Sequence, residues 1–208
     1  MTEDLKHFVE QQINRIENNE FEFLYKFLMR QGALLTDSDL ISEFTRLMLD
    51  IDIDPALYMS EIPQDYLFND SKIKHYSIPE NITRIGQNAF KSCMSLQSVS
   101  IPSSVTILDS SVIETCPCLE TLFIPDSVVE IAVAAINDCV NLKKIHLPLR
   151  VKDPNVGFGL PSLNEFTYSG TCQEFKKSRW CKLKRWREDF KSVLVSCSDG
   201  TIQFKDID

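Results

Sequence analysis

The chain has 208 residues, of which 43% are hydrophobic and 25% charged, and it carries a formal net charge of −8. This composition is that of a soluble globular protein that is long enough to bury a substantial core. The apolar runs are far shorter than the roughly 20 residues that a bilayer-spanning helix needs, and the acidic, amphipathic N-terminus lacks the basic and apolar regions of a secretion signal. We therefore expect neither secretion nor a membrane partner.

The cysteine content indicates free thiols rather than a disulfide framework. There are seven cysteines, an odd number, in a chain that is long enough to hold its core without covalent links. Zinc sites usually combine two closely spaced ligand pairs, whereas only Cys116 and Cys118 are close together in this sequence. We predict a reducing, cytoplasmic setting, with no metal and no other cofactor.

Residues 1–60 are expected to form helices. Apolar side chains recur at helical spacing over 5–16 and over 21–28. A capping box that begins at Thr36 precedes a third apolar stripe, which ends near residue 51. This block is either an N-terminal cap for the repeats that follow it or an independent binding domain.

Negative charge concentrates in the same part of the chain. Residues 1–70 hold 15 acidic and 5 basic side chains, whereas residues 71–160 hold 8 of each. Acids such as Glu17, Glu20 and Glu22 lie on the polar sides of the expected helices, where they are candidates for contact with a basic partner surface. The alternative is a solvated acidic helix surface that has no partner.

A 23-residue repeat follows this block. Four Ile-Pro or Leu-Pro pairs recur every 23 residues, from 78–79 to 147–148, and each ends an apolar-x-x-apolar-x-apolar phrase such as "SLQSVSIP" at 95–102. A fixed period of this size with this spacing is typical of leucine-rich-repeat solenoids. A shortened fifth copy at 163–168 indicates that the array ends there. We therefore predict an α/β protein in which residues 61–168 form a leucine-rich-repeat solenoid with a short parallel β-sheet.

The segment "IPENITRIGQNAFKSCMSLQSVSIPSSV" resembles the BspA-type leucine-rich repeat, because it places Ile-Gly ahead of Ala-Phe and a cysteine before the strand. The tail, with "YSGTCQEFKKSRW" and "VSCSDGTI", is similar to the segment that often closes such arrays, so the resemblance covers about residues 70–204. Later copies depart from the pattern, since Asp109 and Ala132 replace Gly86 at the equivalent positions. The resemblance implies a solenoid that binds other molecules, and it implies no shared catalytic residues.

Alternation along the strand assigns the side chains of one coil. In "LQSVSI", Val99 and Ile101 are expected to point into the core, and Ser98 and Ser100 to point outward. The strand is followed by a corner and then by an irregular or short helical stretch on the convex side. The cysteine that recurs in this stretch is expected to be a small buried hydrophobe.

The outward strand positions vary from copy to copy, unlike the inward ones. Small Ser and Thr side chains allow a partner to approach closely, while Phe123 offers an apolar anchor and His146 a ring that titrates near neutral pH. Concave faces of solenoids commonly bind other molecules. The alternative is a row of solvated strand residues without a partner. The candidate partner-binding residues are His75, Ser98, Ser100, Thr121, Phe123, Lys144, His146 and Glu165.

Residues 169–208 differ from the repeats and are expected to cap the last coil, with Trp180 covering it. Basic and aromatic side chains are interleaved in "KKSRWCKLKRWRED", a composition that also suits phosphate binding and base stacking. Nucleic-acid binding through residues 176–191 is therefore an alternative function. Its candidate contacts are Lys176, Lys177, Arg179, Trp180, Lys184, Arg185, Trp186 and Arg187.

The sequence contains no recognisable catalytic motif. It lacks a nucleophile elbow, a zinc-protease helix motif and a phosphate-binding loop. An uncharacterised enzyme is therefore the second alternative. The main hypothesis is a non-catalytic adaptor or inhibitor that binds another macromolecule, a protein rather than a nucleic acid, through the solenoid face and the acidic helical block.

Overall fold

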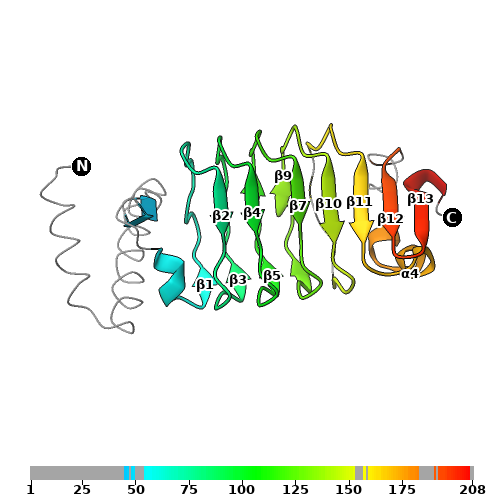
Figure 1. Cartoon of the computed structure of the whole chain (residues 1–208), viewed down its shortest axis with the longest axis horizontal. Coiled ribbons are helices and arrows are strands. Elements are labelled where there is room, and N and C mark those ends of the chain that lie inside the picture. Colours follow the sequence, from blue (N-terminus) through cyan, green and yellow to red (C-terminus); the bar gives the residue numbers. More distant parts are fainter. Residues whose placement is uncertain are drawn as a thin grey trace, which may run out of the picture.

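The computed structural model describes residues 45–46, 48–49, 54–152, 157, 159–182, 190 and 192–206. Within this part, the chain winds into a solenoid whose coils follow one another along the long axis of the molecule (Figure 1). The helices expected at 1–60 lie almost wholly outside the described residues; residues 45–46 and 48–49 are helical, and Met48 is buried. The solenoid is confirmed, while the helical block stays a prediction.

The main sheet consists of two adjoining sheets, whose first five strands lie where the repeat predicts them and whose last two were not predicted. Its strands are β2 (His75–Ser77), β4 (Ser98–Ser100), β7 (Thr121–Phe123), β10 (Lys144–Leu147), β11 (Glu165–Tyr168), β12 (Leu194–Cys197) and β13 (Gly200–Gln203). β2 pairs with β4, and β7, β10, β11 and β12 pair in that order, all in parallel, while β13 is antiparallel to β12. The register follows the repeat, because Tyr76 lies opposite Val99 and Leu122 opposite Ile145.

A second parallel sheet was not foreseen. It consists of β1 (Glu61–Ile62), β3 (Arg84–Ile85), β5 (Ile107–Leu108) and β8 (Glu130–Ile131). The prediction that this stretch of each coil is a simple corner was wrong, although its inward residue Leu108 is buried as expected. The backbone groups of each corner pair with the equivalent groups one coil away, since Ile85 lies opposite Leu108, and Leu108 lies opposite Ile131.

The convex stretch of each coil consists of turns and two-residue strands. β6 (Ile113–Glu114) pairs in parallel with β9 (Ile136–Asn137). Residues 86–143, all of them described, contain no helix, so the irregular form of this stretch is the one adopted. Val112 and Ile113 are buried there, as the sequence predicts.

Two positions in each coil adopt the left-handed backbone conformation without glycine. The first column is Asp65, Asn88, Ser111 and Ala134, and the second is Asn69, Ser92, Thr115 and Asp138, with φ between 50° and 59°. The conformation costs a residue with a Cβ atom about 1–2 kcal/mol and is tolerated best by Asn and Asp. These two reversals recur at the same points of successive coils, which explains why the stretch turns tightly instead of forming a helix.

Replacement of Thr115 by glycine is expected to stabilise the protein by about 0.5–1 kcal/mol. Thr115 is β-branched and has a φ of 55°, so glycine relieves strain that exceeds its own entropic cost. The urea midpoint followed by circular dichroism measures the change. The control is Thr121→Gly in the extended backbone of β7, which should destabilise. Equal destabilisation by both substitutions would contradict the assignment of strain to Thr115.

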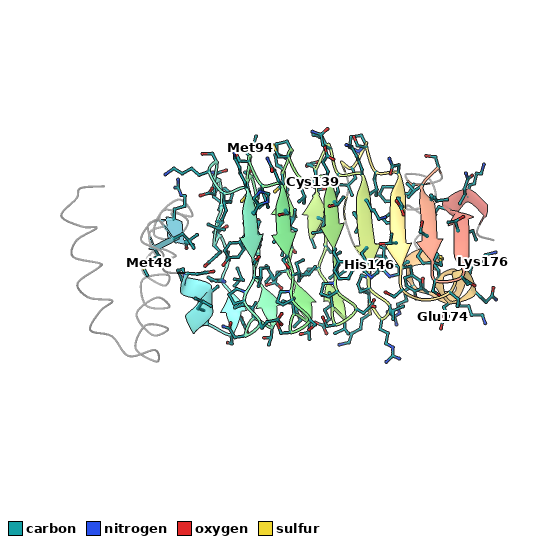
Figure 2. All side chains as sticks on the ribbon, in the orientation of Figure 1. Met48, Met94, Cys139, His146, Glu174 and Lys176 are labelled. Carbon is teal, nitrogen blue, oxygen red and sulfur yellow. The ribbon has the colours of Figure 1, made fainter. Side chains whose placement is uncertain are left out.

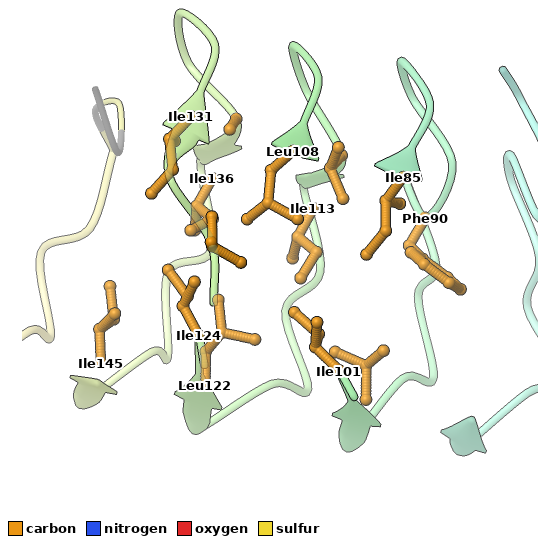
Figure 3. Close-up of a cluster of buried hydrophobic side chains, with 14 of the residues drawn as sticks. Ile85, Phe90, Ile101, Leu108, Ile113, Leu122, Ile124, Ile131, Ile136 and Ile145 are labelled. Carbon is orange, nitrogen blue, oxygen red and sulfur yellow. The ribbon is translucent and has the colours of Figure 1, made fainter. Parts of the chain in front are cut away.

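The core is a continuous apolar column between the two sheets (Figure 3). Ile85, Leu108 and Ile131 project into it from the second sheet, and Ile101 and Ile124 project from the main sheet side. All five are buried, and each has an equivalent 23 residues away. Each coil therefore buries its apolar side chains mainly against the coils before and after it.

The recurring cysteines form a buried column within this core. Cys93 and Cys116 donate their thiol hydrogens to the carbonyl oxygens of Leu67 and Phe90, each at 3.1 Å. Cys139 occupies the equivalent place one coil on and is also buried (Figure 2). Burial raises the pKa of Cys93 to about 12. All three thiols are therefore small core groups, and that of Cys93 stays protonated.

Asp54 anchors the first coil. Its side chain accepts hydrogen bonds from the hydroxyl of Tyr66 at 2.6 Å, from the hydroxyl of Tyr76 at 3.0 Å and from the backbone N–H of Ala56 at 2.9 Å. The last of these bonds caps η1 (Pro55–Tyr58). One carboxylate thus fastens the entry segment to two buried aromatic rings of the solenoid.

The C-terminal end is closed by short helical elements. They are α4 (Cys172–Lys177), η2 (Trp180–Lys182) and η3 (Phe204–Asp206). Trp180 is only 1% exposed, and its indole N–H donates a hydrogen bond of 3.0 Å to the carbonyl oxygen of Pro148. This bond ties Trp180 to the residue that directly follows β10. In the described part of the chain, no helix has the length and apolar character that are needed to cross a membrane.

Candidate protein-binding face

The outward side chains of the main sheet form one face. In β2, β4 and β7 the burial of successive residues alternates as exposed, buried and exposed. Parallel pairing places equivalent outward residues of neighbouring strands in rows. We call this surface the main-sheet face, and its members are His75, Ser77, Ser98, Ser100, Thr121, Phe123, Lys144, His146, Glu165 and Thr167.

The half of the main-sheet face nearer the N-terminus is small and polar. His75 and Ser98 lie opposite each other in the sheet, with the His75 Nδ1 atom 2.8 Å from the Ser98 hydroxyl oxygen. Ser100 and Thr121 are exposed. Ser98, Ser100 and Thr121 have small side chains, so a partner could bring its own backbone close to this part of the sheet.

Phe123 and His146 form the centre of the other half. Their rings stack with centroids 4.4 Å apart and planes 15° apart. Phe123 is 58% exposed, whereas His146 is only 8% exposed. Both residues were predicted to be surface contacts, but His146 is buried, because the Phe123 ring stacks on it. Figure 2 shows His146 on the main sheet.

Polar groups surround the His146 ring on its other sides. Its Nδ1 atom lies 2.9 Å from the Thr167 hydroxyl, and its Nε2 atom lies 3.3 Å from the Ser169 hydroxyl and 3.8 Å from the Asp126 carboxylate. Burial lowers the pKa of His146, and nearby Lys144 lowers it further, against the opposing effect of Asp126. The imidazole is therefore neutral at pH 7, and it is held by hydrogen bonds on both nitrogens.

This cluster differs from a Ser-His-Asp catalytic triad. In a triad the carboxylate orients one imidazole nitrogen and the nucleophile contacts the other. Here Ser169 and Asp126 approach the same nitrogen of His146, while Thr167 contacts the second. Ser169 and Asp126 were not among the predicted site residues. The arrangement fixes the ring that supports Phe123.

An ion pair lies beside the aromatic centre. The Lys144 Nζ atom is 3.0 Å from the Glu165 carboxylate, which also accepts a hydrogen bond of 2.9 Å from the Ser196 hydroxyl. Burial favours the neutral acid, but these two hydrogen bonds outweigh it and lower the pKa of Glu165. Lys144 and Glu165 thus neutralise each other, so the centre of the main-sheet face has little net charge.

In the described part of the basic segment, Trp180 does not offer the base-stacking surface that the alternative function requires. Lys176 and Lys177 are exposed, but Trp180 is buried, so its proposed role in stacking bases was wrong. Arg179 donates to the carbonyl oxygen of Lys152 on the preceding coil. Outside the described residues lie Glu17, Glu20, Glu22, Lys184, Arg185, Trp186 and Arg187.

A groove on the second sheet is lined by two ion pairs and by apolar side chains. Arg84 binds Asp109 through two hydrogen bonds of 3.0 and 2.9 Å, and Lys152 pairs with Glu130. Val133, which also lines the groove, is 65% exposed. Ile107, Leu108, Ile131 and Ala132 line it as well, so the groove combines ion pairs with apolar side chains and has no aromatic residue in its lining.

Groups that can ligate a metal come together at the C-terminal end of the solenoid. The thiols of Cys172 and Cys197 and a carboxylate oxygen of Asp199 lie within 4.8 Å of one another. Cys172 and Cys197 are 25 positions apart in the chain, so the sequence spacing did not predict this cluster.

The stacked coils, the paired strands and the exposed face define a leucine-rich-repeat solenoid. The chain matches the BspA type leucine rich repeat region over residues 61–184, with six copies of the repeat. It belongs to the BspA-type leucine-rich-repeat family. The match begins earlier than the resemblance judged from the sequence and contains one more copy than the five recognised there.

Solved structures agree with this assignment. A leucine rich cell surface protein from Faecalibacterium prausnitzii A2-165 is 25% identical with a TM-score of 0.53, over 56% of this chain and 31% of that chain. The pneumococcal vaccine antigen PcpA is 19% identical with a TM-score of 0.50, over 67% of this chain and 38% of that one, and shows the fold alone. The matched region thus spans about a third of these proteins. No curated protein matches the chain.

Proposed function

We propose that the protein is a non-catalytic adaptor or inhibitor that binds another protein on the main-sheet face around Phe123. The observation that carries this proposal is a large apolar ring, 58% exposed, held against a buried histidine. An exposed phenylalanine without support can turn away from a partner. Phe123 is stacked on a ring that is itself fixed, so little conformational entropy is lost when it is covered.

The surroundings of Phe123 support a role as an anchor. Thr121 precedes it on the same face, and Ser100 occupies the equivalent position one coil earlier; both are small and polar. Binding energy at protein interfaces concentrates in aromatic side chains that are surrounded by weaker contacts. The partner surface that suits this centre is an apolar pocket with hydrogen-bonding groups at its edge.

The charges of the chain suggest a second part of the contact. The centre of the main-sheet face is nearly neutral, whereas residues 1–70 hold 15 acids and 5 bases. This excess supports a partner with a basic surface, contacted by the acidic block at Glu17, Glu20 and Glu22. The free state of all seven cysteines supports a cytoplasmic setting for the complex.

Replacement of Phe123 by alanine is expected to weaken partner binding by about tenfold or more, because it removes the anchor. Val133→Ala is the matched control, since Val133 is exposed but lies in the groove of the second sheet. The wild type and both variants are used in quantitative affinity purification from the native host. The affinity of each partner found is then measured with purified components.

Partners should be lost with Phe123→Ala and retained with Val133→Ala. Equal retention by both variants would remove the main-sheet face from consideration. Equal loss with both would show that binding is not centred on Phe123. Circular dichroism checks that each variant is folded before binding is compared.

A further inference from the structure

Two cysteines from distant parts of the sequence meet at the C-terminal cap. Cys172 is the first residue of α4, and Cys197 is the last residue of β12. Their sulfur atoms lie within 4.8 Å of each other, and the side chains of both residues are partly accessible to solvent. Sulfur atoms at this separation come within bonding distance by small side-chain rotations, provided that the backbone places both residues suitably.

The backbone at both cysteines is held in place by hydrogen bonds. The N–H of Cys172 donates to the Asp199 carboxylate at 2.7 Å, and the N–H of Ser198 donates to the carbonyl oxygen of Gly170 at 3.0 Å. Cys197 also lies opposite Gly200 in the antiparallel hairpin of β12 and β13. These contacts tie the start of α4 directly to the hairpin turn, so the two thiols stay together.

The environments of four other described cysteines differ from that of this pair. The Cys181 thiol is buried and donates to the carbonyl oxygen of Phe175 at 3.0 Å. Cys93 and Cys116 donate to backbone carbonyls inside the solenoid. Cys118 is exposed on a turn. Cys172 and Cys197 thus combine closeness to each other with access from solvent.

We propose that Cys172 and Cys197 are a redox-active pair that forms a reversible disulfide by exchange with a small-molecule disulfide such as oxidised glutathione. In the first step, the thiolate of one cysteine attacks the oxidant, its S–S bond breaks, and one oxidant thiol leaves. In the second step, the other cysteine attacks the mixed disulfide and releases the second oxidant thiol. The two protein thiols lose two electrons and two protons, and the oxidant gains both.

The geometry of the pair carries this proposal: the two sulfur atoms are close together, and both side chains are partly accessible to solvent. Asp199 accepts a hydrogen bond from the Cys172 N–H, so it is a positioning residue.

The disulfide would fasten α4 to the end of the main sheet. It would close a loop that starts at Cys172 and ends at Cys197, and a cross-link over such a loop limits the freedom of the unfolded chain. We expect the oxidised protein to melt at least about 5 °C above the reduced protein. The cap that covers the last coil would thereby be strengthened or released by the redox state.

The test exposes the purified full chain to oxidised glutathione and then alkylates the remaining thiols. Peptide mass spectrometry is expected to find a Cys172–Cys197 cross-link that tris(2-carboxyethyl)phosphine removes, and thiol titration is expected to fall from seven to five. Cys172→Ser should abolish both changes and the shift in melting temperature. Cys118→Ser, the matched control, should lose the same two thiols as the wild type.

Three outcomes would overturn the proposal. One is a stable glutathione adduct on Cys172 without a cross-link, and another is a cross-link that does not alter the melting temperature. The third is tight binding of Zn²⁺ by the reduced protein with no cross-link after oxidation, which would make the cluster a metal site. Asp199→Asn distinguishes a metal site from a redox pair, since this substitution should weaken Zn²⁺ binding but still allow the disulfide to form.

Discussion

Replacement of Phe90 by alanine is expected to lower the free energy of unfolding by about 3–5 kcal/mol. The Phe90 ring is fully buried and packs against Tyr76, with ring centroids 5.5 Å apart. Truncation leaves a cavity between two coils whose backbones are fixed by parallel pairing, so the space cannot close easily. Urea unfolding followed by both circular dichroism and tryptophan fluorescence measures the loss and shows whether the array unfolds in one step.

Phe123→Ala is the matched control for this substitution. It removes the same atoms from a ring that is 58% exposed, so it should cost less than about 1 kcal/mol. We therefore expect Phe90→Ala to lose stability and Phe123→Ala to lose partner binding. A similar loss of stability in both would mean that the stacking of Phe123 on His146 is part of the core.

The second large effect is expected from Gly86→Ala, at about 3 kcal/mol of destabilisation. A Cβ atom at Gly86 would lie 2.7 Å from three backbone atoms, the Gln64 nitrogen, the Ile62 oxygen and the Pro63 carbonyl carbon. The Gly86 N–H also donates to that Ile62 oxygen at 2.8 Å. Backbone must therefore move, and the hydrogen bond between the first two coils would weaken. Thermal unfolding and urea unfolding both measure this change.

The next coils provide the control for Gly86. Asp109 and Ala132 occupy the equivalent positions, and their N–H groups make the same bond, to Ile85 at 3.0 Å and to Leu108 at 2.9 Å. Ala132→Gly should therefore cost no more than about 1 kcal/mol. If Gly86→Ala were equally mild, the close approach of the first coil would not be a constraint on the fold.

The inward positions of the solenoid were predictable from sequence because the same apolar columns recur every 23 residues. Val99 and Ile101 are buried and Ser98 and Ser100 exposed, as strand alternation requires. The second sheet was not predictable in the same way. A strand of two residues, such as Arg84–Ile85, is too short to show a period of two, and it exists only because its neighbours pair with it.

The burial of His146 results from the shortened last step of the repeat. β11 follows β10 after 21 residues rather than 23, and the register places His146 opposite Thr167. Ser169 then reaches the other nitrogen of the ring. The short step was visible in the sequence, but the resulting side-chain contacts were not.

Composition left two roles open for Trp180, of which a place in the cap was the expected one. Basic residues beside tryptophan suit both a cap and a nucleic-acid contact. The deciding contact is the hydrogen bond from its indole N–H to Pro148, which is 32 positions earlier in the chain. Local sequence carries no sign of a partner at that distance.

The 23-residue register also determines how the molecule would respond to mechanical force. A folded coil adds about 4.8 Å to the long axis, which is the spacing of paired strands. The same 23 residues pulled straight would span about 75 Å. Because each coil is held mainly by its neighbours, tension along the axis would meet a series of small barriers of similar height. The protein would behave as an extensible tether that yields one coil at a time, and it would recover its length as successive coils wound back onto those still folded.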